Sequence, residues 1–420
     1  MATKTFDNPF KPGAGHNPPH LAGRAKETER FLKLLEQRSI LENMVLTGLR
    51  GVGKTVLLNR FKTLAIKKQW LWAGTDLSEA ASVSEESLAL RLLTDLSLVT
   101  SNVVYKEVIK RTEALKITEE VKEEKLTYSN LIKLYEETPG LVSDRLKRIL
   151  EITWDALKDS KIKGIIFAYD EAQTIYDKPE KEQFPVALLL DVFQSIQRKE
   201  IPFMLALTGL PTLFPKLVES RTFAERMFTI VSLKELNEDE SKEAIITPIE
   251  DGDCPVSFTD ESVKLIIKVS GGYPYFIQFI CKEVFDIFIQ QYEEDTPQSV
   301  PIKEIIRKLD IDFFAGRWGK ATDRQRELLS VIAHLDNSQE EFTVQDIFEK
   351  SKKYSIAAFS SSHINQMLLT LANAGLVYKN RHGKYSFAVP LLDKFILRQN
   401  LLNLKEQQDR DSGPEHAKET

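Results

Sequence analysis

The chain has 420 residues, which is enough for two or three domains that each bury a core of their own. Hydrophobic residues make up 42% of it and charged residues 28%, as in an ordinary globular protein, and the net charge of −5 excludes a general basic surface, so any contact with DNA needs a local patch. The two cysteines, Cys254 and Cys281, lie in no metal-binding or paired pattern, which argues against a zinc site and a disulfide framework.

The N-terminal segment lacks the apolar core of a signal peptide, and no apolar stretch of the chain approaches the ~20 residues that span a bilayer. We therefore expect a cytoplasmic protein without a membrane partner. Four prolines between residues 8 and 20 disfavour a helix there. They predict an extended arm over residues 1–20, although such a leader can also be an unstructured terminus. Gly23 and Arg24 follow the arm, and a helical pattern comes next.

The segment from Gly48 to Thr55 reads Gly-Leu-Arg-Gly-Val-Gly-Lys-Thr and fits the phosphate-binding pattern G-x-x-x-x-G-K-[ST] at every defined position. A short apolar run precedes it and a helical pattern follows, so the loop lies between a strand and the N-terminus of a helix. Glycines let backbone N–H groups turn toward a triphosphate where a Cβ would collide. Lys54 would reach the β- and γ-phosphates of ATP, and Thr55 would ligate Mg²⁺. The expected cofactor-binding residues here are Gly48, Arg50, Gly51, Val52, Gly53, Lys54, Thr55 and Val56.

A second strand is predicted near residues 69–76 and a helix over residues 84–98. Residues 100–160 then form a long, charge-rich stretch. We expect two or three surface helices in it, broken near Pro139 and Gly140. Positive and negative side chains are mixed along this stretch, so a solvated helical insertion is favoured over a nucleic-acid patch.

The apolar run at residues 162–169 ends in Asp170 and Glu171. A buried parallel strand delivers such residues to the carboxyl edge of a sheet, where α/β folds bind ligands. Asp170 would hold the shell of Mg²⁺, and Glu171 would orient and deprotonate the attacking water. An apolar run with Asp-Glu is common by itself, but an upstream phosphate loop makes the pair specific.

Three further polar residues border the next two predicted strands. Thr208 ends the apolar run at residues 201–207, where a strand-end cap is the plain interpretation. Arg221 and Arg226 precede a final strand at residues 229–233, where surface ion pairs are the plain interpretation.

The C-terminal half is predicted to be helical to about residue 291, with the turn Gly271-Gly272-Tyr273-Pro274 before one apolar helix. Three helices are expected at residues 324–335, 344–350 and 360–374, followed by a hairpin around Gly383. Three helices and a hairpin form the outline of a winged helix-turn-helix domain. The polar tail, residues 403–420, is expected to be disordered.

Taken together, residues 8–400 resemble the AAA+ ATPases of the origin-recognition and initiator-loading branch, and related bacterial ATPases with a C-terminal winged helix. The matching positions are Gly23 and Arg24, residues 48–55, residues 170–173, Thr208, Arg221 and Arg226. The resemblance implies an α/β fold, a three-layer sandwich with a parallel sheet. It also implies a core over residues 21–235, a helical lid over residues 236–318 and a winged helix over residues 319–402.

The resemblance also implies roles for these residues. Gly23 and Arg24 belong to the adenine-side segment, and Thr208 is the sensor of the γ-phosphate or its water. Arg226, or as second choice Arg221, is a finger inserted into a neighbouring subunit, so a homo-oligomer is expected. The lid lacks the usual arginine and instead resembles the signal-transducing STAND branch, in which a turn such as the one containing Pro274 touches the adenine.

Two functions fit this sequence. The first is an ATP- and Mg²⁺-dependent ATPase whose nucleotide state controls assembly, with DNA bound through Lys379, Arg381 and Lys384 of the wing. The second is a slow STAND-like ATP switch that recruits a protein effector without binding DNA. The acidic overall balance favours the second function and the basic wing favours the first.

Overall fold

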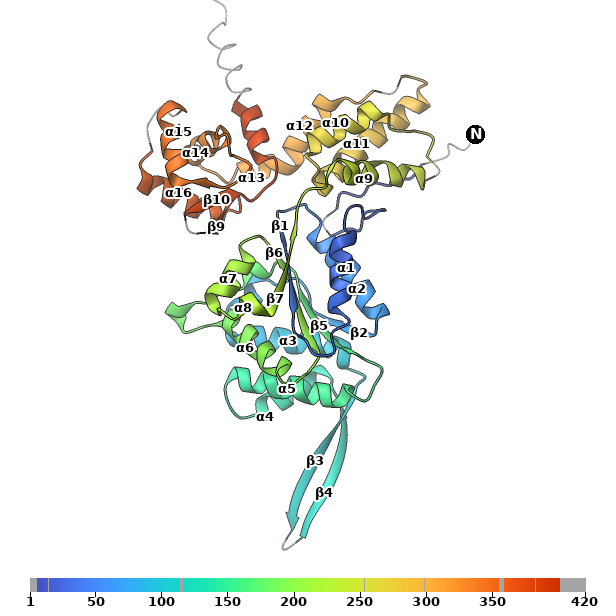
Figure 1. The fold of residues 1–420 in the computed structure, drawn as a ribbon, viewed down its shortest axis with the longest axis vertical. Coiled ribbons are helices and arrows are strands. Elements are labelled where there is room, and N and C mark those ends of the chain that lie inside the picture. The colour runs from blue at the N-terminus through green and yellow to red at the C-terminus, as the bar shows by residue number, and fades with distance from the viewer. Residues whose placement is uncertain are drawn as a thin grey trace, which may run out of the picture. The chain divides into compact units, whose positions relative to one another are not determined.

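A computed structural model describes residues 6–400, apart from residues 14, 114–115, 253, 298, 355–358 and 382. The chain divides into two compact units, which we describe one by one (Figure 1). The sheet unit consists of residues 23–48 and 53–234. The helical unit consists of the described parts of residues 1–22, 49–52 and 235–420.

The sheet unit is built on a five-stranded sheet in which every neighbouring pair is parallel. The strands, in spatial order, are β2 (Trp70–Ala73), β5 (Gly164–Tyr169), β6 (Phe203–Gly209), β1 (Asn43–Gly48) and β7 (Phe228–Leu233). Every residue of β1, β5 and β6 is buried. Their continuous apolar runs follow from this position, because helices cover both faces of a parallel sheet.

Helices on both faces of this sheet complete three layers, as the sequence predicted (Figure 1). On one face, α1 and α2 meet through Phe31 and Phe61, whose stacked ring centroids lie 4.2 Å apart. The other face carries α3, α5 and α6, with Phe193 of α6 against Phe167 of β5. The helices are α1 (Ala25–Leu34), α2 (Lys54–Lys67), α3 (Glu85–Thr100), α4 (Tyr128–Glu137), α5 (Val142–Leu157), α6 (Pro185–Gln197), α7 (Leu213–Ser220) and α8 (Ala224–Met227).

The prediction that residues 100–160 form a helical insertion is wrong over the first half of this stretch. Strands β3 (Val104–Glu113) and β4 (Lys116–Lys125) pair antiparallel there and form a ribbon that projects past α4 and α5 (Figure 1). The reason lies in composition, because valine, isoleucine and threonine recur along residues 104–121 and these β-branched side chains favour strands. Only α4 and α5 follow the prediction.

The helical unit holds three helices of the predicted lid, α9 (Glu238–Glu250), α10 (Asp260–Ser270) and α11 (Pro274–Glu293). A helical connector follows, consisting of α12 (Ile302–Leu309), the π-helix η4 (Asp310–Ala315) and α13 (Gly316–Trp318). The C-terminal part contains the three predicted helices, α14 (Asp323–Ala333), α15 (Val344–Tyr354) and α16 (Ser361–Asn373). The predicted hairpin is β9 (Val377–Arg381) and β10 (Lys384–Phe387), to which β8 (Phe342–Thr343) adds a third strand. No helix among the described residues is long and apolar enough to cross a membrane.

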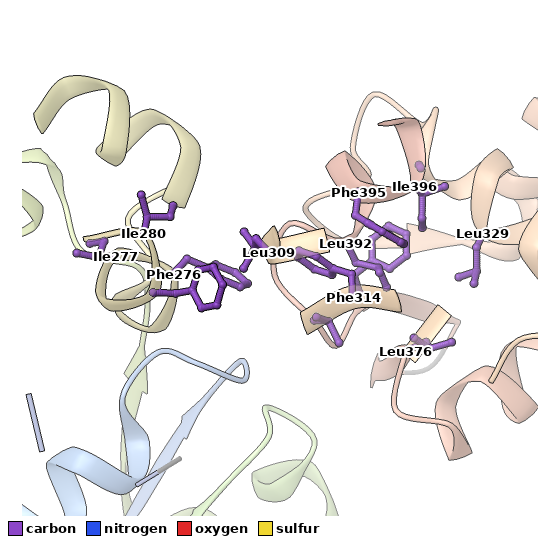
Figure 2. Close-up of a cluster of buried hydrophobic side chains, with 14 of the residues drawn as sticks. Phe276, Ile277, Ile280, Leu309, Phe314, Leu329, Leu376, Leu392, Phe395 and Ile396 are labelled. Carbon is purple, nitrogen blue, oxygen red and sulfur yellow. The ribbon is translucent and has the colours of Figure 1, made fainter. Parts of the chain in front are cut away.

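One hydrophobic core runs through the helical unit from the lid helices to the C-terminal part (Figure 2). Phe276 of α11 lies 5.8 Å from Phe314 of the connector, and Phe314 stacks at 5.1 Å on Phe395, measured between ring centroids. The boundary that the sequence suggested between residues 318 and 319 therefore falls within a shared core. Burial of these large rings holds the lid helices and the C-terminal part together.

The N-terminal arm is non-helical, as its prolines predict, and it packs on the lid helix α11. The Asn8 amide donates to the carbonyl of Lys282 at 2.9 Å and to the carboxylate of Asp286 at 2.7 Å. Phe10 is 2% exposed and stacks on Phe258. Phe10 thus anchors the arm in the core of the helical unit.

In the sheet unit, the buried side chain of Asn43 joins the start of β1 to β6 and to the end of α8, directly before β7. Its amide donates to the carbonyl of Met227, and its Oδ1 accepts the backbone N–H of Leu205 at 2.7 Å. The side-chain amides of Asn43 and Gln197 also donate to each other's oxygen atoms, and Nε2 of Gln197 donates to the carbonyl of Phe203 as well. Buried amide groups need such partners, because an unpaired one costs free energy.

We expect Asn43→Ala to lower the free energy of unfolding by about 2 to 4 kcal/mol, because it leaves a buried backbone donor and acceptor unpaired. Urea denaturation followed by circular dichroism measures this change. The control is Asn130→Ala, which removes one exposed bond to the carbonyl of Lys125 in the same unit and should cost less than about 1 kcal/mol. Equal losses in the two variants would contradict the role given to Asn43.

Candidate functional site

The glycine-rich loop ends where α2 begins at Lys54. Gly51 and Gly53 have φ angles of 81° and 93°, in the left-handed region that a side chain disfavours. Lys54 is buried, and its Nζ donates to the backbone carbonyl of Gly48 at 2.9 Å. The lysine is therefore folded back over its own loop, with the amino end of α2 beside it, where a helix favours negative charge.

Asp170 is the centre of the candidate site. Its Oδ2 accepts the hydroxyl of Thr55 at 2.5 Å, and its Oδ1 accepts both the hydroxyl of Thr208 and the backbone N–H of Glu171, the latter at 2.8 Å. Three residues from separate places in the sequence meet here because β5, β6 and β1 are neighbours and parallel, so that their carboxyl ends share one edge.

The donor set at Asp170 fits a hard divalent cation. The Thr55 hydroxyl and the Asp170 carboxylate are oxygen ligands of the kind that Mg²⁺ takes, and Mg²⁺ in nucleotide sites keeps few protein ligands besides phosphates and water. Among the described residues, no group of three or more His, Cys, Asp or Glu side chains could hold a metal ion.

Glu171 follows Asp170 with a φ of 51°, a left-handed conformation that a non-glycine residue seldom adopts. This backbone turns the chain out of β5 into the short 3₁₀-helix η2 (Ala172–Thr174). The carboxylate of Glu171 accepts the side-chain amide of Gln173. The residue predicted as general base thus lies beside the predicted metal ligand, with its orientation held from within the same turn.

Asp76 is a residue of this edge that the sequence analysis missed. It forms an isolated parallel bridge with Asp170 three residues after the end of β2, and Leu77 donates its backbone N–H to the carbonyl of Asp170 at 3.0 Å. Partial burial, followed by the charges of Asp170 and Glu171, raises the pKa of Asp76. The signal available in the sequence was that Asp76, like Asp170, follows an apolar run.

Gly23 and Arg24 lie at the start of α1. Gly23 has a φ of 66°, and the buried guanidinium of Arg24 donates to the carbonyl of Lys234 at 2.8 Å. Arg24 therefore fastens the start of α1 to the chain that leaves β7.

The two candidate finger arginines differ in their surroundings. Arg221 makes two hydrogen bonds to the carboxylate of Asp191 on α6, at 2.9 and 2.8 Å, and these bonds raise its pKa. Arg226 on α8 is exposed, and its guanidinium makes no hydrogen bond or ion pair with any residue that the structure describes. Between the two, only Arg226 has a guanidinium that is not held by a carboxylate of its own chain.

Loop residues 49–52 belong to the helical unit. Tyr275, the second residue of α11, donates its backbone N–H to the carbonyl of Gly51 at 3.1 Å, and a Cβ at Gly51 would lie 3.0 Å from the Cβ of Tyr275. Pro274 begins that helix. The guanidinium of Arg50 lies against Gly375 at the end of α16. The predicted lid turn thus packs on the loop through Tyr275, the neighbour of Pro274.

The three predicted wing residues lie on the hairpin of β9 and β10. Lys379 is exposed and Lys384 is half-buried. The side chain of Arg381 and the whole of His382 lie outside the described residues. Helix α16, the predicted recognition helix, contains no lysine or arginine, and its Leu369 is 59% exposed.

Comparison with known proteins identifies the fold. A family model described as a domain of unknown function (DUF8462) matches residues 311–396, and no curated protein matches the chain. The ADP form of the Aeropyrum pernix ORC2 protein aligns with a TM-score of 0.52 at 14% identity, over 94% of this chain and 97% of that one. Its ADPNP-ADP complexes give a TM-score of 0.49 at 14% identity, over 94% and 98%.

The Aeropyrum pernix ORC1 protein in complex with DNA gives a TM-score of 0.46 at 14% identity, over 93% of this chain and 95% of that one. At 14% identity these likenesses show a shared fold only, and that conclusion rests on the ADP form of the ORC2 protein. The chain therefore shares the α/β fold of the Aeropyrum pernix ORC2 protein, and the three layers around a parallel sheet are those that the sequence predicted.

Proposed function

We propose that this chain is an ATP-binding AAA+ ATPase whose nucleotide state controls its assembly and its engagement of a partner. The observation that carries the proposal is the convergence of Thr55, Thr208 and the backbone of Glu171 on the carboxylate of Asp170, next to a helix N-terminus that follows a glycine-rich loop. This is the arrangement that Mg²⁺ and a triphosphate need. The ADP form of a protein with this fold supports a nucleotide as the ligand.

Each residue of the site would have its own role in ATP hydrolysis. Backbone N–H groups of the loop and of the first turn of α2 would surround the phosphates, and Lys54 would exchange the Gly48 carbonyl for phosphate oxygens. Thr55 and Asp170 would hold Mg²⁺, which when bound neutralises charge that develops on the transferred phosphoryl group. Glu171 would accept the proton of the attacking water, and Thr208 would orient that water or the γ-phosphate.

Control of the C-terminal domain, residues 319–402, is supported by contacts inside the helical unit. Gly51 accepts a hydrogen bond from Tyr275, and Arg50 lies against Gly375. A loop that rearranges on binding phosphates would therefore act on the lid turn and on the end of α16. Gly23, Arg24 and Pro274 would lie on the adenine side of the nucleotide.

Arg226 would act in a neighbouring subunit. A guanidinium that stabilises the charge of a transferring phosphoryl group must be available to another molecule, and the exposed Arg226 meets that requirement better than the paired Arg221. The expected form is a homo-oligomer that assembles when ATP is bound.

For the partner, DNA is our first choice. The C-terminal domain would act as a winged helix, with Lys379, Arg381 and Lys384 contacting phosphates and α16 entering the major groove. One observation favours the alternative, a slow ATP switch that recruits a protein effector. The exposed face of α16 carries Leu369 and no basic residue, which suits a protein surface better than a polyanion.

The site is tested by separating ATP binding from hydrolysis. We expect Lys54→Ala to weaken ATP binding by about 10- to 100-fold, because a charged phosphate contact is lost. Glu171→Gln should keep ATP affinity and lower kcat by about 10² to 10⁴. Titration calorimetry with a non-hydrolysed ATP analogue and phosphate release measure the two quantities.

The matched controls for this test are Lys67→Ala on the exposed end of α2 and Glu180→Gln on an exposed turn. Both should behave like the wild type. A Glu171→Gln protein that hydrolyses ATP at the wild-type rate would refute the assignment of the general base.

The finger is tested with Arg226→Ala. We expect it to keep ATP affinity and to lower kcat by about 10³, because the removed charge acts in trans. Mixing Arg226→Ala with Glu171→Gln should restore activity, since a mixed interface pairs one intact finger with one intact base. A protein that stays monomeric with ATP and partner at every working concentration would contradict this prediction.

The wing is tested by replacing Lys379, Arg381 and Lys384 together by glutamate. We expect the parent to bind DNA weakly and with little sequence preference. The logarithm of its binding constant should fall with the logarithm of the salt concentration with a shallow slope, about −0.9 per phosphate contact. The triple variant should lose DNA binding at low salt. Fluorescence anisotropy with labelled duplexes measures this. The control, with an equal change in charge, replaces the exposed Lys264, Lys268 and Lys303 by glutamate. If the wing variant binds DNA like the parent, the effector alternative becomes the better one.

A further inference from the structure

The carboxylate of Glu171 is held by a side chain that neither function above uses. Its Oε2 accepts a hydrogen bond from the amide Nε2 of Gln173, two residues further along the chain. Its Oε1 accepts no hydrogen bond from any residue in the described part of the chain. One oxygen of the predicted base is therefore fixed, and the other is left to accept a proton.

Gln173 is itself fixed by the segment that follows β6. The backbone N–H of Leu210 donates to Oε1 of Gln173 at 3.1 Å. A backbone N–H can only donate, so it selects the oxygen of the amide, and the NH₂ group must then face Glu171. The orientation of the amide follows from its partners.

Gly209 leaves the space that this amide needs. A Cβ at Gly209 would lie 2.4 Å from Oε1 of Gln173, closer than two such atoms can approach. The φ of Gly209 is not among the positive values, so its requirement for glycine is one of space and not of backbone conformation.

Lys216 fastens the same turn from α7. Its Nζ donates to the backbone carbonyl of Gln173 at 2.9 Å. Burial lowers the pKa of this lysine, and the nearby charge of Glu219 opposes the effect. The side chain of Gln173 is thus tied to Leu210, directly after β6, and its backbone is tied to α7, both of which follow Thr208 in the chain.

We propose that Gln173 is a positioning residue for the hydrolysis assigned above, on which this inference rests. It holds the Glu171 carboxylate so that Oε1 takes the proton of the attacking water, and it links that carboxylate to the β6–α7 segment. In this step the water oxygen bonds to the γ-phosphorus, the bond from that phosphorus to the β-phosphate oxygen breaks, and ADP leaves.

The test uses Gln173→Glu, which keeps the acceptor for Leu210 but removes the donor to Glu171 and places a like charge beside it. Gln173→Leu is the second variant, which removes both bonds. For each we expect kcat for ATP to fall at least tenfold, with the Kd for a non-hydrolysed analogue and the Tm within the range of the control. The control is Gln290→Leu, which breaks the exposed amide-to-carboxylate bond of Gln290 to Glu294.

Two further measurements show whether the loss of kcat in the Gln173 variants acts through Glu171 or reflects a general structural role of Gln173. In the Glu171→Gln background, single-turnover rates should not fall further when Gln173→Leu is added. Gly209→Ala should give the same loss of kcat by displacing the amide, and the Gln173→Leu and Gly209→Ala losses should not add.

An active wild type in which both Gln173 variants keep kcat within twofold would overturn this inference and leave the proposed function standing. An additional loss in the Glu171→Gln background would overturn it as well. A wild type that binds no ATP, or binds it without turnover under any partner condition, would overturn the proposed function and this inference with it.

Discussion

The carboxylate of Asp170 is the point on which the candidate site depends. Two threonine hydroxyls and one backbone N–H donate to it, and they come from α2, β6 and the turn after β5. Such a meeting is available only where the carboxyl ends of neighbouring parallel strands share an edge. The burial of β1, β5 and β6 on both faces fixes their register, and this register fixes the distances at the site.

The loop that precedes this site has a divided position in the molecule. Gly48 and Gly53 belong to the sheet unit, while the residues between them group with the lid helices and the C-terminal part. The hydrogen bond from Tyr275 to Gly51 and the contact of Arg50 with Gly375 lie within the helical unit. Residues 49–52 of the predicted phosphate loop thus contact the lid turn and the segment after α16. The control by nucleotide state proposed above would act through these contacts.

Rigidity within the helical unit would support the control proposed above. The aromatic series Phe276, Phe314 and Phe395 passes from α11 through the connector to the end of the C-terminal part (Figure 2). A packed core of this kind transmits a displacement because it has few alternative arrangements. The π-helix that holds Phe314 is an irregularity of the sort found at functional positions in helices.

The sequence by itself determined the glycine-rich loop between β1 and α2, the position of Asp170 and Glu171 after β5, the parallel sheet and the helices of the C-terminal half. These features depend on local spacing and on runs of apolar residues, which a chain displays directly. It did not determine the β3–β4 ribbon, because charged residues mask the β-branched pattern there. Asp76 was also beyond it, and the sequence included Gln173 in the motif at residues 170–173 without showing its partners Glu171 and Leu210. The shared core across residue 318, the docking of Phe10 and the pairing of Arg221 with Asp191 were likewise decided by tertiary structure, because long-range packing chooses the partners of a side chain and local sequence does not.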